Sequence, residues 1–340
     1  MSGAFVGAGR CSAPAEQICT ATRAGPSRYP AGQMISRAAP PPARRSTTDL
    51  VLFVIPSLIW GTTWLAIKFQ LGVVAPELSV GWRFGLAALV LLGFCAARRI
   101  PLRFSPRDHA ALALLGLLLF GVNYVFVYES EQHLTSGLVA VLFALMVFEN
   151  LLGARIFFGT PVPRAVLAGA VLGFAGVALL FWPEVAGFHA GDGQAIGIAE
   201  AVGSTVLASA GNLLSQRLFR RGIGVIPGTA VAMGYAATAV IGWCAVAGVP
   251  FAFDLRAPYV LSIAYLALFG SVVAFVSFLT LVKRIGAGRS GYTAAVIPTV
   301  AMLASTLFEG YRWTVGAGVG MVLVLGGTVL VLRAKERVAG

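Results

Sequence analysis

Long apolar runs alternate with short polar segments along most of the chain. A helix needs about 20 apolar residues to cross a hydrocarbon layer about 30 Å thick, and its backbone groups must be bonded within the segment. This length filter predicts ten membrane-spanning helices, at 50–68, 80–97, 110–128, 137–158, 165–182, 196–214, 228–249, 260–282, 291–308 and 315–332. Glu200 interrupts the sixth span and Pro298 the ninth, so these two are the least regular.

The segments outside the spans differ in composition. Residues 1–49 are rich in Ala, Gly, Pro, Ser and Arg and lack the apolar core of a signal peptide. We expect a disordered cytoplasmic tail there, with an organellar transit peptide as the alternative and Met34 as a candidate native start. The membrane region then divides into two halves, 50–182 and 196–332, followed by a short basic cytoplasmic tail at 333–340.

Composition places the chain among membrane proteins. Hydrophobic residues make up 58% of it, charged residues only 11%, and the mean hydropathy is +0.86. The net charge of +12 comes from short basic clusters between apolar runs, so we expect no nucleic-acid partner. Most lysines and arginines fall in every second loop, at 98–107, 155–164, 217–221, 283–289 and 333–337. Because cytoplasmic loops retain basic residues, both chain ends are predicted to be cytoplasmic.

The two halves resemble each other. A Ser-Gly pair opens a small, apolar helix in both "LTSGLVAVLFALM" and "GRSGYTAAVIPTV". The segments "GAVLGFAG" (169–176) and "GMVLVLGG" (320–327) each carry glycines seven residues apart, on one helix face, where a neighbouring helix can approach closely. Because each half has five spans, an odd number, the second half is predicted to be inverted. Inverted repeats place a site near the membrane midplane and permit alternating access, although small-residue repeats also occur in unrelated membrane helices.

Several segments together resemble the EamA family of the drug/metabolite transporter superfamily. They are "IWGTTWLAIK" in the first span, "PELSVGWRFGLAALVLL" in the second, "TSG" before the fourth, "GAVLGFAGVALL" in the fifth and "GMVLVLGGTVLV" in the tenth. The resemblance implies an all-α polytopic membrane protein with ten helices in two inverted five-helix repeats, located in a bacterial inner membrane and without a cofactor. Family members mostly export amino acids, other metabolites or drugs. The chain departs from the family by having Gly159-Thr160 instead of Gly-Glu and Glu149-Asn150 in the fourth span.

A polar and aromatic stripe lies on the first span. Trp60, Thr63, Trp64 and Lys68 are spaced by three and four residues, which places them on one side of a helix. Lys68 either extends its amine to the membrane interface or faces a wet interior, and the tryptophans could form an interfacial belt. Trp60 lies nearer the middle of the span, which favours a stripe that faces a substrate cavity.

Two charged residues lie inside apolar spans. An isolated charge at mid-bilayer costs about 2.5 to 3.5 kcal/mol, so Arg83 and Glu149 are expected to face a partner or water. Arg83 either contacts substrate or fastens helix ends through bonds to carbonyl oxygens. Glu149 is the candidate for proton coupling, because a carboxylate in a medium of low dielectric can bind and release a proton.

Further polar residues at membrane depth complete the candidate site, although such residues also join helices without touching a substrate. They are Asn123, Tyr124, Asn150, Asn212 and Gln216. Asn212 falls in the sixth span where Thr63 falls in the first, as expected for two walls of one cavity. We expect no metal and no cofactor.

These features predict a secondary transporter, not an enzyme, that exports small metabolites such as amino acids, with or without proton coupling. Lys68, Arg83 and the two tryptophans would suit a carboxylate attached to an apolar group. A multidrug or cation exporter that uses Glu149 is the alternative within the same fold. A membrane-embedded enzyme and a channel are the alternatives from other classes. The expected partners are a small-molecule substrate and the lipid bilayer, and a homodimer is left open.

Overall fold

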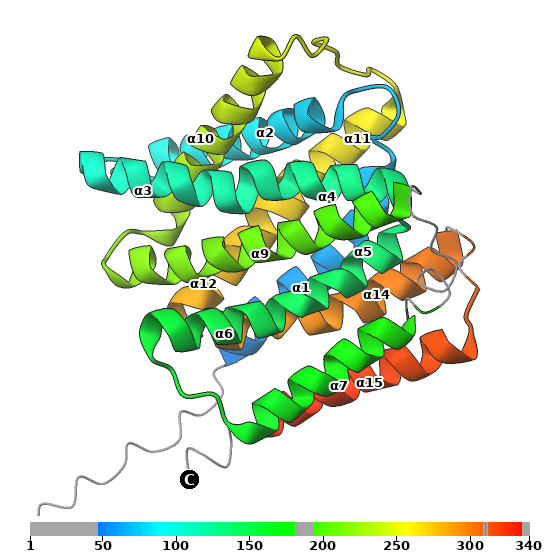
Figure 1. Ribbon diagram of the computed structural model, residues 1–340. Helices are drawn as coiled ribbons and strands as arrows, with labels where there is room; N and C mark the ends of the chain where they lie inside the picture. The colour runs from blue at the N-terminus through cyan, green and yellow to red at the C-terminus, as the bar shows by residue number, and fades with distance from the viewer. Residues whose placement is uncertain (1–46, 181, 183–192, 309, 311, 335–340) are drawn as a thin grey trace, which may run out of the picture. The chain divides into compact units, whose positions relative to one another are not determined.

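The structure of the protein is a computed structural model that describes residues 47–180, 182, 193–308, 310 and 312–334. Every regular element within these ranges is a helix (Figure 1). Most of the predicted tails 1–49 and 333–340 lies outside the described residues, as do Met34 and the segment 183–192. Residues 47–49 belong to the first helix and 333–334 to the last one. The all-helical part of the predicted fold is confirmed.

The helices of the first half are α1 (Thr47–Lys68), α2 (Pro76–Ala97), α3 (Pro106–Gly116), η1 (Leu117–Gly121), α4 (Val122–His133), α5 (Ser136–Leu142), η2 (Phe143–Leu145), α6 (Met146–Phe158) and α7 (Arg164–Leu180). The second half contains α9 (Gly193–Arg220), α10 (Val225–Val246), α11 (Ala257–Tyr265), η3 (Leu266–Val273), α12 (Ala274–Ile285), α13 (Ala287–Ser290), α14 (Thr293–Phe308) and α15 (Val315–Ala334). Consecutive elements such as α3, η1 and α4 form one continuous helix.

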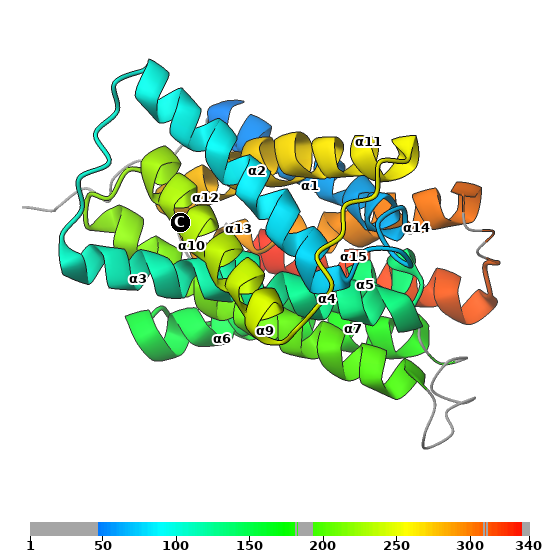
Figure 2. The ribbon, with the colours of Figure 1, turned by 90° about the horizontal axis from the view of Figure 1, so that it is seen from above.

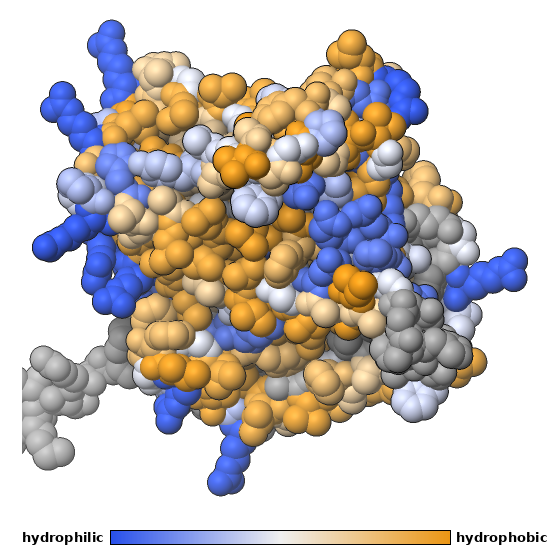
Figure 3. Space-filling view, turned by 45° about the horizontal axis from the view of Figure 1, so that its top comes forward, coloured by the Kyte–Doolittle hydropathy of each residue, from blue (hydrophilic) through white to orange (hydrophobic). Residues whose placement is uncertain are grey.

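Seven helices in the described part of the chain are long and apolar enough to cross a membrane. They cover 47–68, 76–97, 106–133, 136–158, 193–220, 225–246 and 257–285. Three shorter apolar helices occupy the other predicted spans, at Arg164–Leu180, Val296–Phe308 and Val315–Gly327. Figure 3 shows a broad hydrophobic face with hydrophilic residues gathered on two opposite sides of it, as a bilayer requires. The count of ten spans and the inverted repeat stay predictions.

Several helices begin earlier or end later than the hydropathy pattern predicts. Helix α2 begins at Pro76 and α3 at Pro106, because proline has a fixed φ and lacks the N–H that would have no partner in a first turn. The hydroxyl of Ser105 accepts a hydrogen bond from the backbone N–H of Asp108 and so caps α3. Hydropathy does not detect such signals, because they depend on proline and on a capping hydroxyl and not on apolar character.

Two of the long helices contain a π-helical segment. One is η1 in the helix 106–133, and the other is η3 in the helix 257–285. A π-helical turn leaves carbonyl oxygens free to bind side chains, and such turns occur frequently at functional sites. In η3, the carbonyl oxygen of Gly270 accepts a hydrogen bond from Trp60 on α1, at 3.0 Å. The irregular segment therefore joins the two halves.

The most extensive helix contacts each pair one helix of the first half with one of the second. These pairs are α7 with α15, α2 with α10, α4 with α9 and α1 with α14. Helices α7 and α15 lie side by side in both ribbon views (Figures 1 and 2). The halves are thus interleaved, and the core is formed between them.

Glycines determine how closely α7 and α15 approach. A Cβ atom on Gly320 would lie 2.5 Å from the carbonyl oxygen of Gly176, and one on Gly327 would lie 2.5 Å from that of Gly169. The two glycine pairs seven residues apart, noted in the sequence, therefore face each other across this contact. Only glycine permits backbones to approach to this distance.

Replacing Gly327 by Ala should lower the thermal stability of the detergent-purified protein. The new methyl group would collide with backbone atoms that cannot rotate away, at a cost of about 1 to 3 kcal/mol. Gly326→Ala is the matched control, because a Cβ atom added at that position would meet no atom of another helix within 4 Å. Equal melting temperatures for the two variants would show that this contact is looser than the structure indicates.

Candidate functional site

A small cavity lies between helices of the two halves. Its walls come from α1, η1, α4, η2, α6, α9, α12 and α14. The lining residues are Trp60, Thr63, Trp64, Ile67, Leu119, Asn123, Tyr124, Phe143, Met146, Ala208, Asn212, Phe275, Phe278 and Ile297. The cavity has a volume of about 40 Å³ as measured to the centres of water-sized spheres. One water needs about 10 to 15 Å³ on that measure, so the cavity is large enough for a few waters.

The aromatic stripe predicted on the first span lies in this cavity. Trp60 and Trp64 are only 7% and 6% exposed, so neither belongs to an interfacial belt. The ring of Trp60 packs edge-on against Phe275 and Phe278, and Trp64 packs in the same way against Phe143. Thr63 lies between the tryptophans in the same wall and donates a hydrogen bond to the carbonyl oxygen of Trp60, at 3.0 Å.

Asn123, Tyr124 and Asn212 supply the other predicted residues of the lining. The amide of Asn123 donates to the carbonyl oxygen of Leu119 on its own helix, at 3.2 Å. The amide of Asn212 donates to the sulfur of Met146, at 3.4 Å. Asn212 and Thr63 do line one cavity, from α9 and α1 respectively, which is the placement that the sequence similarity of the halves predicts.

Lys68 is outside the cavity lining. Its amine donates to the carbonyl oxygens of Glu131 and Leu134, the latter at 2.8 Å. These carbonyls belong to the C-terminal end of α4 and the residue that follows it, where the helix dipole favours a positive charge. Lys68 thus fastens α1 to the turn between α4 and α5.

Arg83 is fully buried and joins three helical segments. Its Nε atom donates to the hydroxyl of Ser271 at 3.0 Å, and Nη1 donates to that of Tyr128 at 3.4 Å. Its guanidinium also lies over the rings of Tyr124 and Phe84, at 4.5 and 5.1 Å from their centroids. Arg83 is therefore behind Tyr124, and does not itself line the cavity.

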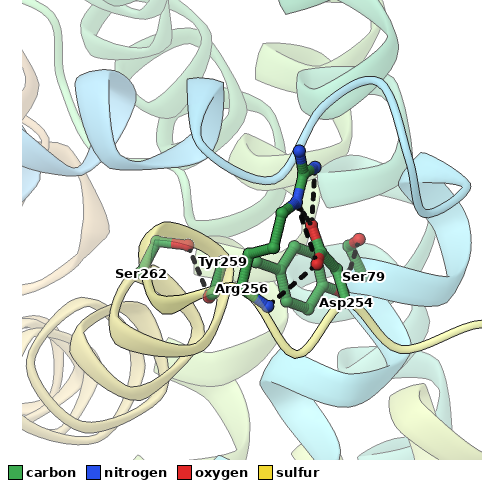
Figure 4. Close-up of polar contacts among 5 residues, drawn as sticks. All are labelled: Ser79, Asp254, Arg256, Tyr259 and Ser262. Carbon is green, nitrogen blue, oxygen red and sulfur yellow. Dashed lines mark hydrogen bonds and ion pairs between the residues drawn. The ribbon is translucent and has the colours of Figure 1, made fainter.

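A chain of hydrogen bonds extends from Arg83 to one end of the helices. Tyr128 donates to Gln70 at 2.9 Å, and Gln70 donates to Ser262 at 3.2 Å. Ser262 bonds the backbone of Tyr259, whose hydroxyl shares a hydrogen bond with Ser79 on α2 (Figure 4). We call this set the Arg83 network; it consists of Gln70, Ser79, Arg83, Tyr128, Tyr259, Ser262 and Ser271.

The loop before α11 is fastened beside this network. Arg256 forms an ion pair with Asp254 at 2.8 Å (Figure 4), and its hydrogen bonds lower the pKa of that carboxyl below the ordinary value. The contact is therefore fully present above the ordinary pKa of an aspartate and is lost as the pH falls through the lowered one. The indole N–H of Trp82 also donates to the carbonyl oxygen of Ala252, at 3.2 Å.

Glu149, Asn150 and Gln216 lie outside the cavity lining, at the contact of α6 with α9 and α13. Glu149 accepts a hydrogen bond from Thr205 at 2.8 Å, and Asn150 accepts one from Ser209 at 3.1 Å. The side-chain oxygen of Gln216 accepts from the backbone N–H of Ala287, at 2.6 Å. The second oxygen of Glu149 has no hydrogen-bond partner among the described residues.

Three aromatic residues of the lining were not predicted from the sequence. Phe143, Phe275 and Phe278 are apolar residues within apolar spans, so no polar signal distinguishes them from residues that face lipid. Met146 was also not predicted, for the same reason. Only packing between distant helices shows that these side chains turn towards one cavity.

The sequence matches a known protein family over most of its length. The sequence pattern of the EamA-like transporter family matches residues 48–182 and 195–333. The chain belongs to the EamA-like transporter family. As a member of this family it is a multi-pass membrane protein of the transporter type, as its sequence predicts.

Individual relatives support the family assignment. The chain is 28% identical to the uncharacterized inner membrane transporter YedA of Escherichia coli, over 82% of this chain and 88% of that protein. It is 28% identical to the protein PagO of Salmonella typhimurium, but the match spans less than half of that relative, 42% of its length. It is 22% identical to a probable amino-acid metabolite efflux pump of Escherichia coli, over 83% of this chain and 94% of the pump.

A solved crystal structure shares the fold of this EamA-like chain. The two superpose with a TM-score of 0.69 at 20% identity, over 86% of this chain and 99% of the other. At that level of identity, the likeness concerns the fold alone.

Replacing the buried Arg83 by Met should lower the melting temperature of the purified protein. The change leaves the hydroxyls of Ser271 and Tyr128 without their donor, at a cost of about 1 to 3 kcal/mol. Arg256→Met is the control, because that side chain is 69% exposed and exposed ion pairs contribute little. If both variants melt together with the unaltered protein, Arg83 does not fasten these helices.

Proposed function

We propose that the chain is a secondary transporter of a bacterial inner membrane that exports small metabolites by alternating access. The observation that carries the proposal is the cavity enclosed by helices of both halves, with polar and aromatic side chains in its wall. The family pattern and the name of YedA support transport and the inner membrane. The name of the probable amino-acid metabolite efflux pump supports export of a small metabolite.

The small volume of the cavity supports a mechanism with moving helices. A space of about 40 Å³ does not hold a metabolite, so the cavity must widen before a substrate can bind. To admit a substrate, helices of the two halves must separate. At one end the bonds of the Arg83 network and of Lys68 would break, and at the other end the bond between Gln216 and Ala287 would break.

The pairing of helices supports ten spans in two inverted repeats. If each span n corresponds to span n+5, the contact of α1 with α14 corresponds to that of α9 with α6, and both contacts are present. The contact of α4 with α9 likewise corresponds to that of α12 with α1. The π-helical segments η1 and η3 fall in the third and eighth predicted spans, which also correspond. The proposed topology has both chain ends in the cytoplasm, as the basic loops predict.

The aromatic lining favours a multidrug or cation exporter as the second candidate. Trp60 and Trp64 belong to the cavity wall, and aromatic rings attract cations, although the guanidinium of Arg83 over the Tyr124 ring opposes a cation there. An amino acid was expected from Lys68 and Arg83, but the bonds of both residues go to protein groups outside the lining. Their roles as substrate contacts stay predictions.

Glu149 is the proposed proton carrier. One of its oxygens accepts a hydrogen bond from Thr205, and the other has no partner among the described residues, so a proton can be bound there. Because Glu149 lies on α6 and Thr205 on α9, a change in its charge would act on a contact between the halves. This gives a physical route from protonation to helix movement.

Transport should be saturable and show counterflow in vesicles that contain the purified protein. Vesicles loaded with an unlabelled amino acid, nucleobase or quaternary amine would be tested for uptake of the same labelled compound, with empty vesicles as control. A carrier accumulates label above equilibrium during counterflow, because each return movement carries an unlabelled molecule. Flux that rises linearly with the gradient for every accepted compound would instead support a channel.

Replacing Glu149 by Gln should abolish the part of the flux that a pH gradient drives, while exchange without a gradient continues. The amide keeps the size of the carboxyl group but cannot bind and release a proton. Glu129→Gln is the matched control, because Glu129 is on α4 and bonds Gln132 on the same helix. Unchanged pH-driven flux in Glu149→Gln would exclude this residue from coupling.

A further inference from the structure

Three residues that line the cavity each have a buried polar atom without a hydrogen-bond partner among the described residues. Trp64 has an indole N–H without a hydrogen-bond partner among the described residues, and Asn123 and Asn212 each have a side-chain oxygen without one. The three residues are 6%, 2% and 1% exposed and line the same cavity from three helices. Each amide nitrogen already donates one hydrogen bond within the protein, to the carbonyl oxygen of Leu119 and to the sulfur of Met146 respectively. The unpaired polar atoms of these three lining residues are therefore one donor nitrogen and two acceptor oxygens.

These atoms favour a ligand with complementary groups. A buried polar group without a partner costs about 1 to 3 kcal/mol, so a molecule that pairs with all three recovers that energy on binding. The matching molecule has two N–H or O–H donors for the amide oxygens and one acceptor for the indole N–H. The remaining wall is largely aromatic, and aromatic rings pack well on a planar ring.

The charge of the cavity wall restricts the class of ligand further. No Lys, Arg, Asp or Glu lines the cavity within the described part of the chain. A carboxylate would lose its hydration, gain one N–H donor and face two amide oxygens that repel it. A cation would be repelled by the buried guanidinium of Arg83, which lies 4.5 Å from the centre of the Tyr124 ring in the cavity wall.

On the basis of the carrier function proposed above, we propose that the substrate is an uncharged planar ring that bears amide-type N–H donors and a carbonyl acceptor. Nucleobases and heterocyclic carboxamides have this chemistry. Asn123 and Asn212 accept from the donors, Trp64 donates to the carbonyl, and the rings of Trp60, Phe275 and Phe278 contact its faces once the helices have separated.

Matched compounds test the class directly. Orotate is uracil with an added carboxylate, and nicotinate has a carboxylate where nicotinamide has an amide. The cation 1-methylnicotinamide completes the set. Each would be measured by counterflow in vesicles and by the shift in melting temperature of the detergent-purified protein, because a ligand of the folded state raises its stability. We expect uracil and nicotinamide to exchange and to stabilise the protein at least tenfold more effectively, by half-saturating concentration, than the three charged compounds.

Variants test the three residues separately. Asn123→Leu and Asn212→Leu remove an acceptor with little change in size, and Trp64→Phe removes the donor but keeps a ring. Each should weaken uracil about three- to tenfold, as expected for one lost hydrogen bond. Thr238→Val is the control, because Thr238 is exposed on α10 and bonds only its own helix, through Gly234. Asn212→Asp should shift the preference from nicotinamide towards 1-methylnicotinamide, a gain that misfolding cannot produce.

The outcomes separate this inference from the carrier proposal. Stabilisation by uracil or nicotinamide without counterflow would support the ligand class and contradict the carrier. Counterflow in which orotate, nicotinate or 1-methylnicotinamide equals or exceeds its uncharged partner would support the carrier and overturn the ligand class. If neither uncharged compound stabilises the protein or exchanges, the ligand class is overturned.

Discussion

The structure depends on the need to pair every polar group that is removed from water within the membrane region. Small polar side chains mostly find a partner on their own helix. Examples are Ser57, Ser204 and Thr280, whose hydroxyls donate to carbonyl oxygens three or four residues away. Larger groups bond between helices, as Arg83 does with Ser271 and Tyr128, although its Nη2 atom has no hydrogen-bond partner among the described residues. The cavity departs from this constraint, since three of its polar atoms lack partners among the described residues. Such groups are costly unless a ligand or water reaches them. Unpaired atoms also occur elsewhere, as on Glu149 and Asn150, but three of them belong to residues that line this one cavity.

Two kinds of contact hold the halves together, and they differ in how easily the helices can separate or slide at them. Between α7 and α15, glycines bring backbones into direct contact, and any sliding would bring carbonyl oxygens into collision. Near the cavity, the contacts are side-chain hydrogen bonds, such as those of Gln70 and Tyr128, which can exchange partners one at a time. A rocking movement would therefore leave the glycine contact intact and act on the Arg83 network. Alternating access needs this division between a fixed pair of helices and a separable one.

Lys68 and Arg83 were expected to contact the substrate, but both lie outside the cavity lining and bond protein groups. Lys68 and Arg83 donate hydrogen bonds to carbonyl oxygens and hydroxyls of the protein, and these bonds offset part of the cost of a charge at membrane depth. Arg83 still affects the cavity, because its guanidinium lies against Tyr124 in the wall. The proposed ligand class follows from this arrangement, in which the wall is neutral and a positive charge lies behind it.

Sequence alone was sufficient for the helical class, the position of most helices and the glycine face of 169–176 and 320–327, because hydropathy and residue spacing act locally. It also identified Trp60, Thr63, Trp64, Asn123, Tyr124 and Asn212 as polar or aromatic groups at membrane depth, all of which line the cavity. It could not distinguish them from Lys68, Arg83, Asn150 or Gln216, which bond protein groups instead. Nor could it select Phe275 or Phe278 from the other apolar residues. Those decisions belong to tertiary structure, because whether a side chain meets a cavity, a partner or lipid depends on helices that lie far away in the sequence.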